Sequence, residues 1–193
     1  MPSRFATRVI MISLVAAMCA VALSQTSDRP RGEVRMRSGL QSPEIIIRKK
    51  QRALEVYDSG KLIKAFTIVL GFEPVGDKEV EGDGKTPEGE FYVFTKNAKS
   101  KFHLSLGLSY PSKKDAERGL AKGLISKLEH GQIFSAIDKK QMPPQKTALG
   151  GEIYIHGGGT RRDWTWGCVA LDNDKIEELF RATPLGTKVT ITP

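Results

Sequence analysis

The sequence predicts a mostly β domain, largely antiparallel, with a helical insertion and one short helix near its end. Apolar β-type segments recur from residue 44 onward, separated by turn residues. Residues 115–140 instead place leucines and isoleucines at helical spacing. A second, shorter helical pattern follows Cys168. The chain of 193 residues shows no internal repeat or low-complexity tract, so one domain with a single hydrophobic core is expected.

Residues 1–24 are typical of a secretory signal. A basic start precedes fifteen apolar residues, fewer than the ~20 that a membrane-spanning helix needs. Ala22-Leu23-Ser24 resembles a cleavage site, so we expect export to the periplasm or cell envelope and no stable membrane span after cleavage. An uncleaved N-terminal anchor is the alternative. Residues 25–43 are polar, basic and aperiodic, and predict a flexible tether ahead of the domain at 44–193.

Signal cleavage changes the charge and the cysteine content. The count of Lys and Arg falls from 30 to 28 against 22 acidic residues, which leaves a net charge of +6. Such a charge suits an anionic polymer or surface, whereas nucleic acid is disfavoured because no basic run is interleaved with aromatic residues. Cys19 leaves with the signal. Cys168 then has no partner for an internal disulfide, which marks it as a reactive thiol or an intermolecular link.

The strands are expected in several stretches of the domain. Asp58-Ser59-Gly60 is a hairpin turn between two of them. A loop at 141–151 (QMPPQKTALGG) leads to the strand that carries the first functional residue. The expected strands are two or three within 44–50 (EIIIRKK) and 52–71 (RALEVYDSGKLIKAFTIVLG), followed by Glu90–Thr95 (EFYVFT), 101–111 (KFHLSLGLSYP), 152–157 (EIYIHG) and 187–193 (TKVTITP).

Two regions are expected to be helical. Residues 115–140 predict one or two helices inserted between strands, because apolar residues recur there three and four positions apart. After the cysteine, Asp172 or Asn173 can cap a helix over about Asp174–Arg181.

Three local patterns that carry chemistry in other proteins do not hold here. Gly82–Thr86 (GDGKT) lacks the upstream glycine of a phosphate-binding loop, and Pro87 follows it directly. The HGGG stretch at His156–Gly159 has no partner G-x-S-x-G elbow, which argues against a serine hydrolase. The three histidines lie far apart in the sequence and Cys168 stands alone, so no metal site is expected.

His156 and Cys168 form the pair that we favour as the reactive site. His156 ends an apolar strand, and Cys168 follows twelve residues later, directly after Gly167. A thiol attacks carbonyls as the thiolate, and a nearby imidazole lowers the thiol pKa and carries the proton to the leaving group. The backbone N–H groups of Gly167 and Cys168 are candidate oxyanion donors. Taken singly, a structural histidine and a small core cysteine are the alternatives.

These residues resemble the L,D-transpeptidase (YkuD-type) catalytic domain, and the resemblance covers roughly Glu44 to Pro193. It implies a β-sandwich-like fold with a helical insertion and a short helix after the catalytic cysteine. The matching stretches are Lys85–Phe91 (KTPEGEF), Ser105–Pro111 (SLGLSYP), Ile155-His156-Gly157, Thr165-Trp166-Gly167-Cys168 and the closing 186–193 (GTKVTITP).

The resemblance also implies the chemistry. Cys168 would be the nucleophile, His156 the proton donor and acceptor, and the Gly157 carbonyl the group that orients the imidazole, with no cofactor. The family's enzymes attack the L-centre carbonyl of diaminopimelate in a peptidoglycan tetrapeptide stem and expel D-alanine. The acyl group passes to another diaminopimelate, which forms a 3→3 cross-link, or to a lysine of an anchored protein. Expected partners are therefore stem peptides or a wall-attached protein.

The sequence departs from the common family pattern at two positions. Many members carry histidine where Trp166 stands, and arginine or asparagine where Ala170 stands. The DWTxGC form resembles the YafK-like subgroup, in which some members hydrolyse rather than transpeptidate. An L,D-carboxypeptidase or amidase acting through the same thioester is therefore the first alternative function. A catalytically silent wall-binding module is the second, and the joint presence of His156 and Cys168 argues against it.

Candidate substrate contacts complete the expected site. Trp166 could form a wall for the stem peptide or its glycan, with simple loop anchoring as the alternative. The other candidates are Thr165, Arg162, Tyr110 and His103.

Overall fold

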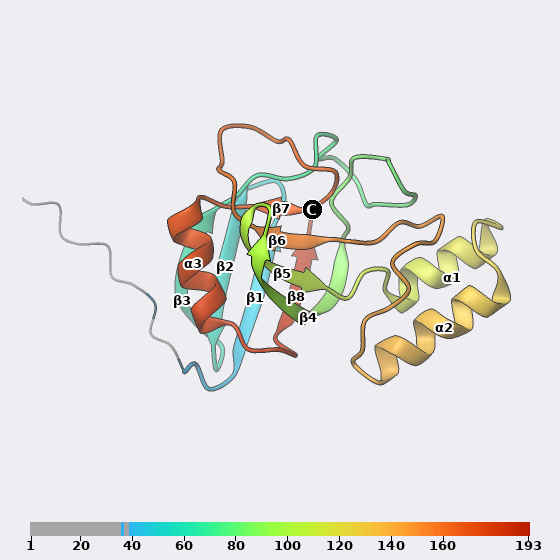
Figure 1. Ribbon diagram of the computed structural model, residues 1–193, viewed down its shortest axis with the longest axis horizontal. Coiled ribbons are helices and arrows are strands. Elements are labelled where there is room, and N and C mark those ends of the chain that lie inside the picture. The colour runs from blue at the N-terminus through green and yellow to red at the C-terminus, as the bar shows by residue number, and fades with distance from the viewer. Residues whose placement is uncertain (1–35, 37–38) are drawn as a thin grey trace, which may run out of the picture. The chain divides into compact units, whose positions relative to one another are not determined.

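The structure is a computed structural model that describes residue 36 and residues 39–193. The predicted signal at 1–24 and most of the predicted tether at 25–43 lie outside the described residues. In the described part of the chain, eight strands form one curled sheet in the order β3-β2-β1-β8-β4-β5-β6-β7 (Figure 1). They are β1 (Pro43–Arg48), β2 (Ala53–Asp58), β3 (Lys61–Thr67), β4 (Gly89–Ser100), β5 (His103–Leu108), β6 (Tyr154–His156), β7 (Val169–Ala170) and β8 (Lys188–Thr192).

The strand β4 joins the two halves of the sheet. Residues 89–92 pair with β8, and residues 93–100 pair with β5, with a shift of register between Val93 and Thr95. Such an irregularity bends a strand and increases its twist. Most neighbours are antiparallel, as the sequence predicts, but β1 pairs with β8 and β6 pairs with β7 in parallel.

One apolar core lies inside the curl. Alternate residues of the strands point into it, because successive side chains of a strand face opposite sides of a sheet. Ile45 and Ile47 of β1 are fully buried together with Leu106 and Leu108 of β5 and with Ile155 of β6. The two halves of the sheet therefore share a sandwich-like interior.

The segment that follows β3 closes the curl against β7. Val69 and Ala170 exchange both backbone hydrogen bonds, at 3.0 and 2.9 Å. Farther along the same segment, Phe72 N–H donates to the Thr165 carbonyl at 3.0 Å. The short strand β7 is thereby held on one side by β6 and on the other by residues from the first half of the chain.

Three helices within residues 39–193 flank the sheet. The helices α1 (Lys113–Ala121) and α2 (Lys127–Asp138) lie at one end of it and α3 (Asn173–Ala182) at the other (Figure 1). Both α1 and α2 begin with a serine capping box and share a small apolar cluster around Ile133. The prediction of one or two helices at 115–140 is confirmed as two.

The last helix begins where the sequence predicts, but its cap differs. Asp172 occupies the N-cap position without a side-chain bond to the helix. Its carboxylate accepts instead from the Thr160 hydroxyl at 3.0 Å, and the Asn173 side-chain oxygen accepts from Gly158 N–H at 2.9 Å. Asp172 is therefore the N-cap residue, as predicted, but its side chain and that of Asn173 hold the loop after His156 and not the helix.

Candidate active site

His156 ends β6, and Cys168 directly precedes β7, the strand that pairs with β6 in parallel. The register places Ile155 beside Val169 and His156 beside Ala170, which puts Cys168 level with Tyr154. Cys168 and His156 are therefore two positions out of register and have side chains on the same face of the sheet. Both residues line one cleft.

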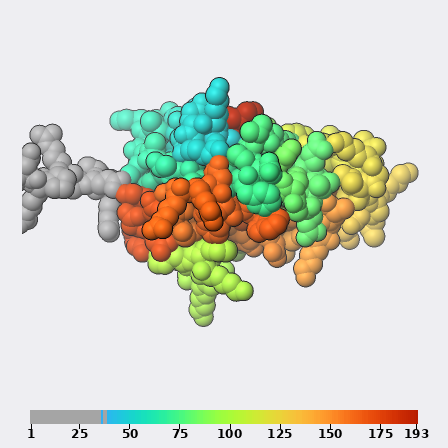
Figure 2. Space-filling view, turned by 90° about the horizontal axis from the view of Figure 1, so that it is seen from above, coloured from blue at the N-terminus to red at the C-terminus, as the bar shows by residue number. Residues whose placement is uncertain are grey.

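A cleft joins the two side chains. We call it the hairpin cleft, because the β4–β5 hairpin forms much of its wall; this hairpin is the yellow-green projection in Figure 2. Its volume is about 410 Å³. It is lined by Asn97, Lys99, Ser100, Lys101, Phe102, Ser105, Glu152, Tyr154, His156 and Cys168.

The imidazole of His156 is held in one orientation. Its Nδ1 lies 2.5 Å from the Gly157 carbonyl, so Nδ1 carries the hydrogen and Nε2 is the free base. The Phe102 ring stacks on it with centroids 4.6 Å apart, and the Trp164 ring packs edge-on at 5.6 Å. His156 is only 2% exposed, and this burial lowers its pKa below the ordinary 6.5. The predicted partner of the imidazole, the Gly157 carbonyl, is in place.

The Cys168 thiol rests against backbone groups. Its Sγ donates to the Glu152 carbonyl and accepts from the Tyr154 N–H, each at 3.4 Å. Burial raises the pKa of the thiol to about 11, although the Tyr154 N–H and the charge of Lys78 act to lower it. The expectation that the imidazole lowers the thiol pKa is therefore wrong for this resting arrangement. Thiol and imidazole are both neutral near pH 7.

Thr165 organises the turn that presents the nucleophile. Its hydroxyl donates to the Cys168 carbonyl at 2.7 Å and accepts from Gly167 N–H at 3.2 Å. Gly167 has φ +120°, and a Cβ there would lie 2.6 Å from the Lys85 carbonyl oxygen, so only glycine fits. Thr165 is 3% exposed and supports the turn rather than meeting substrate, contrary to the prediction.

The two candidate oxyanion donors differ in how they are engaged. The Gly167 N–H is bonded to Thr165, as just described. The Cys168 N–H has no hydrogen-bond partner within the part of the chain that the structure describes. The oxyanion role of Gly167 stays a prediction.

Asp163 anchors the loop between His156 and Cys168. Its carboxylate receives the Arg52 guanidinium at 2.6 Å and the Leu70 N–H at 2.8 Å. The loop is thus tied to the strand β2 side of the sheet, which brings the nucleophile back beside the histidine. Sequence reasoning noted this aspartate only as part of a motif.

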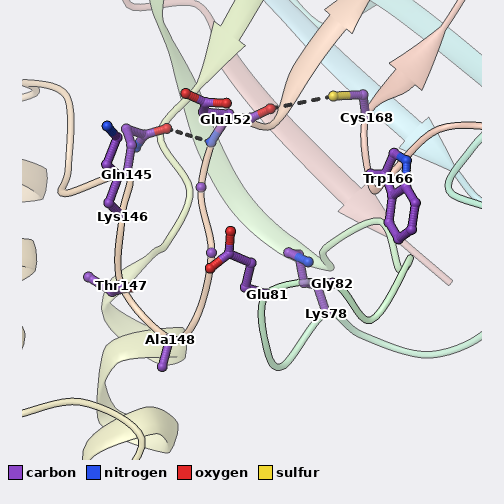
Figure 3. Close-up of a pocket in the computed structure, with 12 residues that line it drawn as sticks. Lys78, Glu81, Gly82, Gln145, Lys146, Thr147, Ala148, Glu152, Trp166 and Cys168 are labelled. Carbon is purple, nitrogen blue, oxygen red and sulfur yellow. Dashed lines mark hydrogen bonds between the residues drawn. The ribbon is translucent and has the colours of Figure 1, made fainter.

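A second cleft reaches Cys168 from the other side, and we call it the loop cleft (Figure 3). Its volume is about 740 Å³. Trp166 lies on its rim, 69% exposed and edge-on to Phe72 with centroids 4.7 Å apart. The cleft is lined by Lys78, Glu81, Gly82, Gln145, Lys146, Thr147, Ala148, Gly150, Gly151, Glu152, Trp166 and Cys168.

Three predicted substrate contacts do not meet at these clefts. Tyr110 is fully buried, and its hydroxyl donates to the Leu149 carbonyl at 2.8 Å, so its role is structural and the prediction is wrong. His103 lies 2.9 Å from Glu177 of α3 and lines neither cleft. Arg162 lines a separate depression beside Trp164. Sequence reasoning missed Glu152, whose carbonyl contacts the thiol, and Phe102, which stacks on the imidazole.

Comparison with known proteins identifies the family. The family model for the L,D-transpeptidase catalytic domain (YkuD) matches residues 42–191. The chain therefore belongs to the YkuD L,D-transpeptidase catalytic domain family, whose activity is acyl transfer.

Individual relatives agree with this family. YqjB of Bacillus subtilis (strain 168), a candidate L,D-transpeptidase by name, is 26% identical over 182 residues, covering 91% of this chain and 84% of its own. The helical cell shape determining protein Pgp2 of Campylobacter jejuni is 25% identical with a TM-score of 0.54, over 79% of this chain and 48% of that one. Bd1075 of Bdellovibrio bacteriovorus shares the fold, with 20% identity and a TM-score of 0.53 over 83% and 51%. The chain thus spans about half the length of these two solved structures.

Among residues 36 and 39–193, no helix is both long enough and apolar enough to cross a membrane.

Proposed function

We propose that the protein is a peptidoglycan L,D-transpeptidase that works through a Cys168 acyl-enzyme on tetrapeptide stems. The observation that carries this proposal is that Cys168, directly before β7, and His156, at the end of the adjacent strand β6, both line the hairpin cleft. The bond from His156 Nδ1 to the Gly157 carbonyl supports it, because it leaves Nε2 free to accept a proton.

Acylation would follow from the neutral resting pair. The thiol turns from the Glu152 carbonyl toward the imidazole, and Nε2 takes its proton as Sγ attacks the L-centre carbonyl of diaminopimelate. The Cys168 N–H faces the oxyanion that forms. Protonated His156 then gives its proton to the D-alanine nitrogen as the C–N bond breaks, which leaves a thioester and free D-alanine.

Deacylation would reverse these roles. An incoming amine loses a proton to Nε2 as it attacks the thioester carbon, and the thiolate that leaves recovers this proton. With a second diaminopimelate as the amine, the product is a 3→3 cross-link; with a lysine of a protein, it is an attached protein. With water, the same thioester gives L,D-carboxypeptidase activity, and cleavage of a wall-linked protein would be amidase activity.

We place this reaction in the periplasm or cell envelope. The basic, apolar and polar order of the first 24 residues supports export, and the basic net charge suits an anionic wall. A silent wall-binding module is the remaining alternative, in which the cleft binds stems without turnover.

One experiment tests these functions together. The purified protein and its Cys168→Ala variant are incubated with tetrapeptide-stem muropeptides, and products are followed by mass spectrometry. Cross-linked dimers with loss of D-alanine support transpeptidation, and tripeptide monomers support hydrolysis. Neither product, together with no mass adduct on Cys168, would refute both enzymatic functions.

A further inference from the structure

The two clefts divide the substrate into two parts, if the proposed function holds. His156 lines the hairpin cleft and does not line the loop cleft, whereas Cys168 lines both. The nitrogen that leaves, and the one that arrives, must reach the imidazole. Both therefore belong to the hairpin cleft, and the acyl half that stays on the sulfur extends into the loop cleft.

Lys78 is a buried cation on the wall of the loop cleft. It is only 2% exposed, and its ammonium donates to Asp83 at 2.8 Å and to the Val80 carbonyl at 2.9 Å. An ammonium has three N–H donors, so one remains beyond these two bonds. Figure 3 shows the Lys78 nitrogen directed into the cleft that holds Cys168. This donor can serve a negative group of a bound ligand.

Asp83 holds Lys78 in place from the same loop. Its carboxylate also accepts the backbone N–H groups of Glu79, Val80 and Lys85, at 2.8 to 3.1 Å. The ammonium is thus fixed in position by the loop. A fixed charge loses little side-chain entropy on binding, which favours selectivity over a flexible surface lysine.

Glu81 supplies a negative group to the same cleft. It lines the loop cleft as an exposed residue, and no ion pair joins it to Lys78 in the described part of the chain. A ligand end group that carried only a carboxylate would be repelled by the negative charge of Glu81. A ligand end group that carries both an ammonium and a carboxylate matches Lys78 and Glu81 together.

We infer that Lys78 and Glu81 recognise the distal amino-acid centre of the diaminopimelate residue on the acyl half. Its carboxylate meets the Lys78 ammonium, and its ammonium meets the Glu81 carboxylate. This distal centre is linked by a short methylene chain to the carbonyl that Cys168 attacks, so it falls on the acyl side. The inference rests on the proposed function and makes the two residues determinants of its donor specificity.

The test compares donors on the unaltered protein, so it does not depend on the folding of a variant. Acylation of Cys168 is measured by mass spectrometry with four stems: diaminopimelate, its distal carboxamide, its distal N-acetyl form, and lysine, which keeps the amine but lacks the carboxylate. Loss of a charge-assisted bond predicts about tenfold or more lower kcat/KM for the carboxamide and for lysine.

Variants then assign each half of the recognition. In Lys78→Met the preference for diaminopimelate over lysine should fall to about threefold or less, and in Glu81→Gln the penalty for N-acetylation should fall likewise. Lys139→Met, on the exposed end of α2, is the matched control and should keep every ratio.

The outcomes separate this inference from the proposed function. Equal acylation by all four stems overturns the inference while the enzymatic function stands. Donor ratios that stay unchanged in both Lys78→Met and Glu81→Gln also overturn it. Absence of acylation with every stem overturns both.

Discussion

Raising the pH should accelerate the alkylation of Cys168 by iodoacetamide over the whole range from neutrality to about pH 10. Only the thiolate reacts with this reagent, so its rate follows the thiolate fraction. If the resting site held a thiolate–imidazolium pair, the thiolate would already exist at acid pH. The alkylation rate would then stay constant as the pH is raised further. The structure instead has a neutral, half-buried thiol bonded to the Glu152 carbonyl.

The magnitude follows from the pKa. Burial disfavours the charged form, so the pKa of the thiol rises from 9.0 to about 11. The direction means that the folded protein keeps the proton as the pH rises, and the thiolate fraction grows about tenfold per pH unit until the pH passes the raised pKa. At pH 7 about one thiol in 10⁴ is ionised, roughly 100-fold fewer than for an ordinary cysteine.

The assay is a time course of Cys168 alkylation, followed on its own proteolytic peptide, with free cysteine as the reference. Near pH 7 we expect Cys168 to be alkylated about two orders of magnitude more slowly than free cysteine, and we expect this rate to rise steadily with pH. His156→Ala should leave this slope unchanged, because the neutral imidazole does not stabilise the resting thiolate. A rate that is flat from pH 5 to 8, or faster than free cysteine, would refute the neutral resting pair.

Three further outcomes follow from the site. Thr165→Val should lower stability by about 2 kcal/mol, or roughly 4–8 °C in a thermal melt, since two buried backbone groups lose their partner, whereas Thr165→Ser should stay close to the parent. Gly167→Ala should lower the melting temperature more than Gly60→Ala. Both glycines have positive φ, but only at position 167 would the added Cβ lie 2.6 Å from a backbone oxygen; equal melting temperatures for the two variants would contradict this steric argument. Phe102→Ala should raise the pKa of His156 toward 6.5 in an NMR titration, because the stacked ring shields the imidazole from water.

The residues that carry the chemistry could be predicted because their signals are local. His156 stands at the end of an apolar strand, and Cys168 follows a glycine whose backbone conformation other residues adopt poorly. The hairpin turn before β3 was predictable for the same reason, since Ser59 and Gly60 both take positive φ.

The features that could not be predicted from the sequence depend on contacts between segments that are far apart in the chain. The strand β7 is two residues long and has no periodicity to read, so its parallel pairing with β6 could not be foreseen. Tyr110 looked available to substrate, but its hydroxyl is satisfied by a carbonyl 39 positions away. The Glu152 contact to the thiol uses a backbone oxygen, and backbone groups leave no side-chain signature. Because lysine side chains are rarely buried, nothing in the sequence indicated that Lys78 forms part of the wall of the loop cleft.

The closure of the sheet at Val69 and Ala170 has a consequence for heat inactivation. The strand β7, which directly follows Cys168, is hydrogen-bonded through Ala170 to Val69 in the first half of the chain. The turn before Cys168 is bonded to the same half, because the Phe72 N–H donates to the Thr165 carbonyl. Fraying at β7 must therefore break bonds on both flanks at once, and reactivity should vanish together with the global melt rather than ahead of it. Hydrogen exchange at the Ala170 amide would then report the stability of the whole domain.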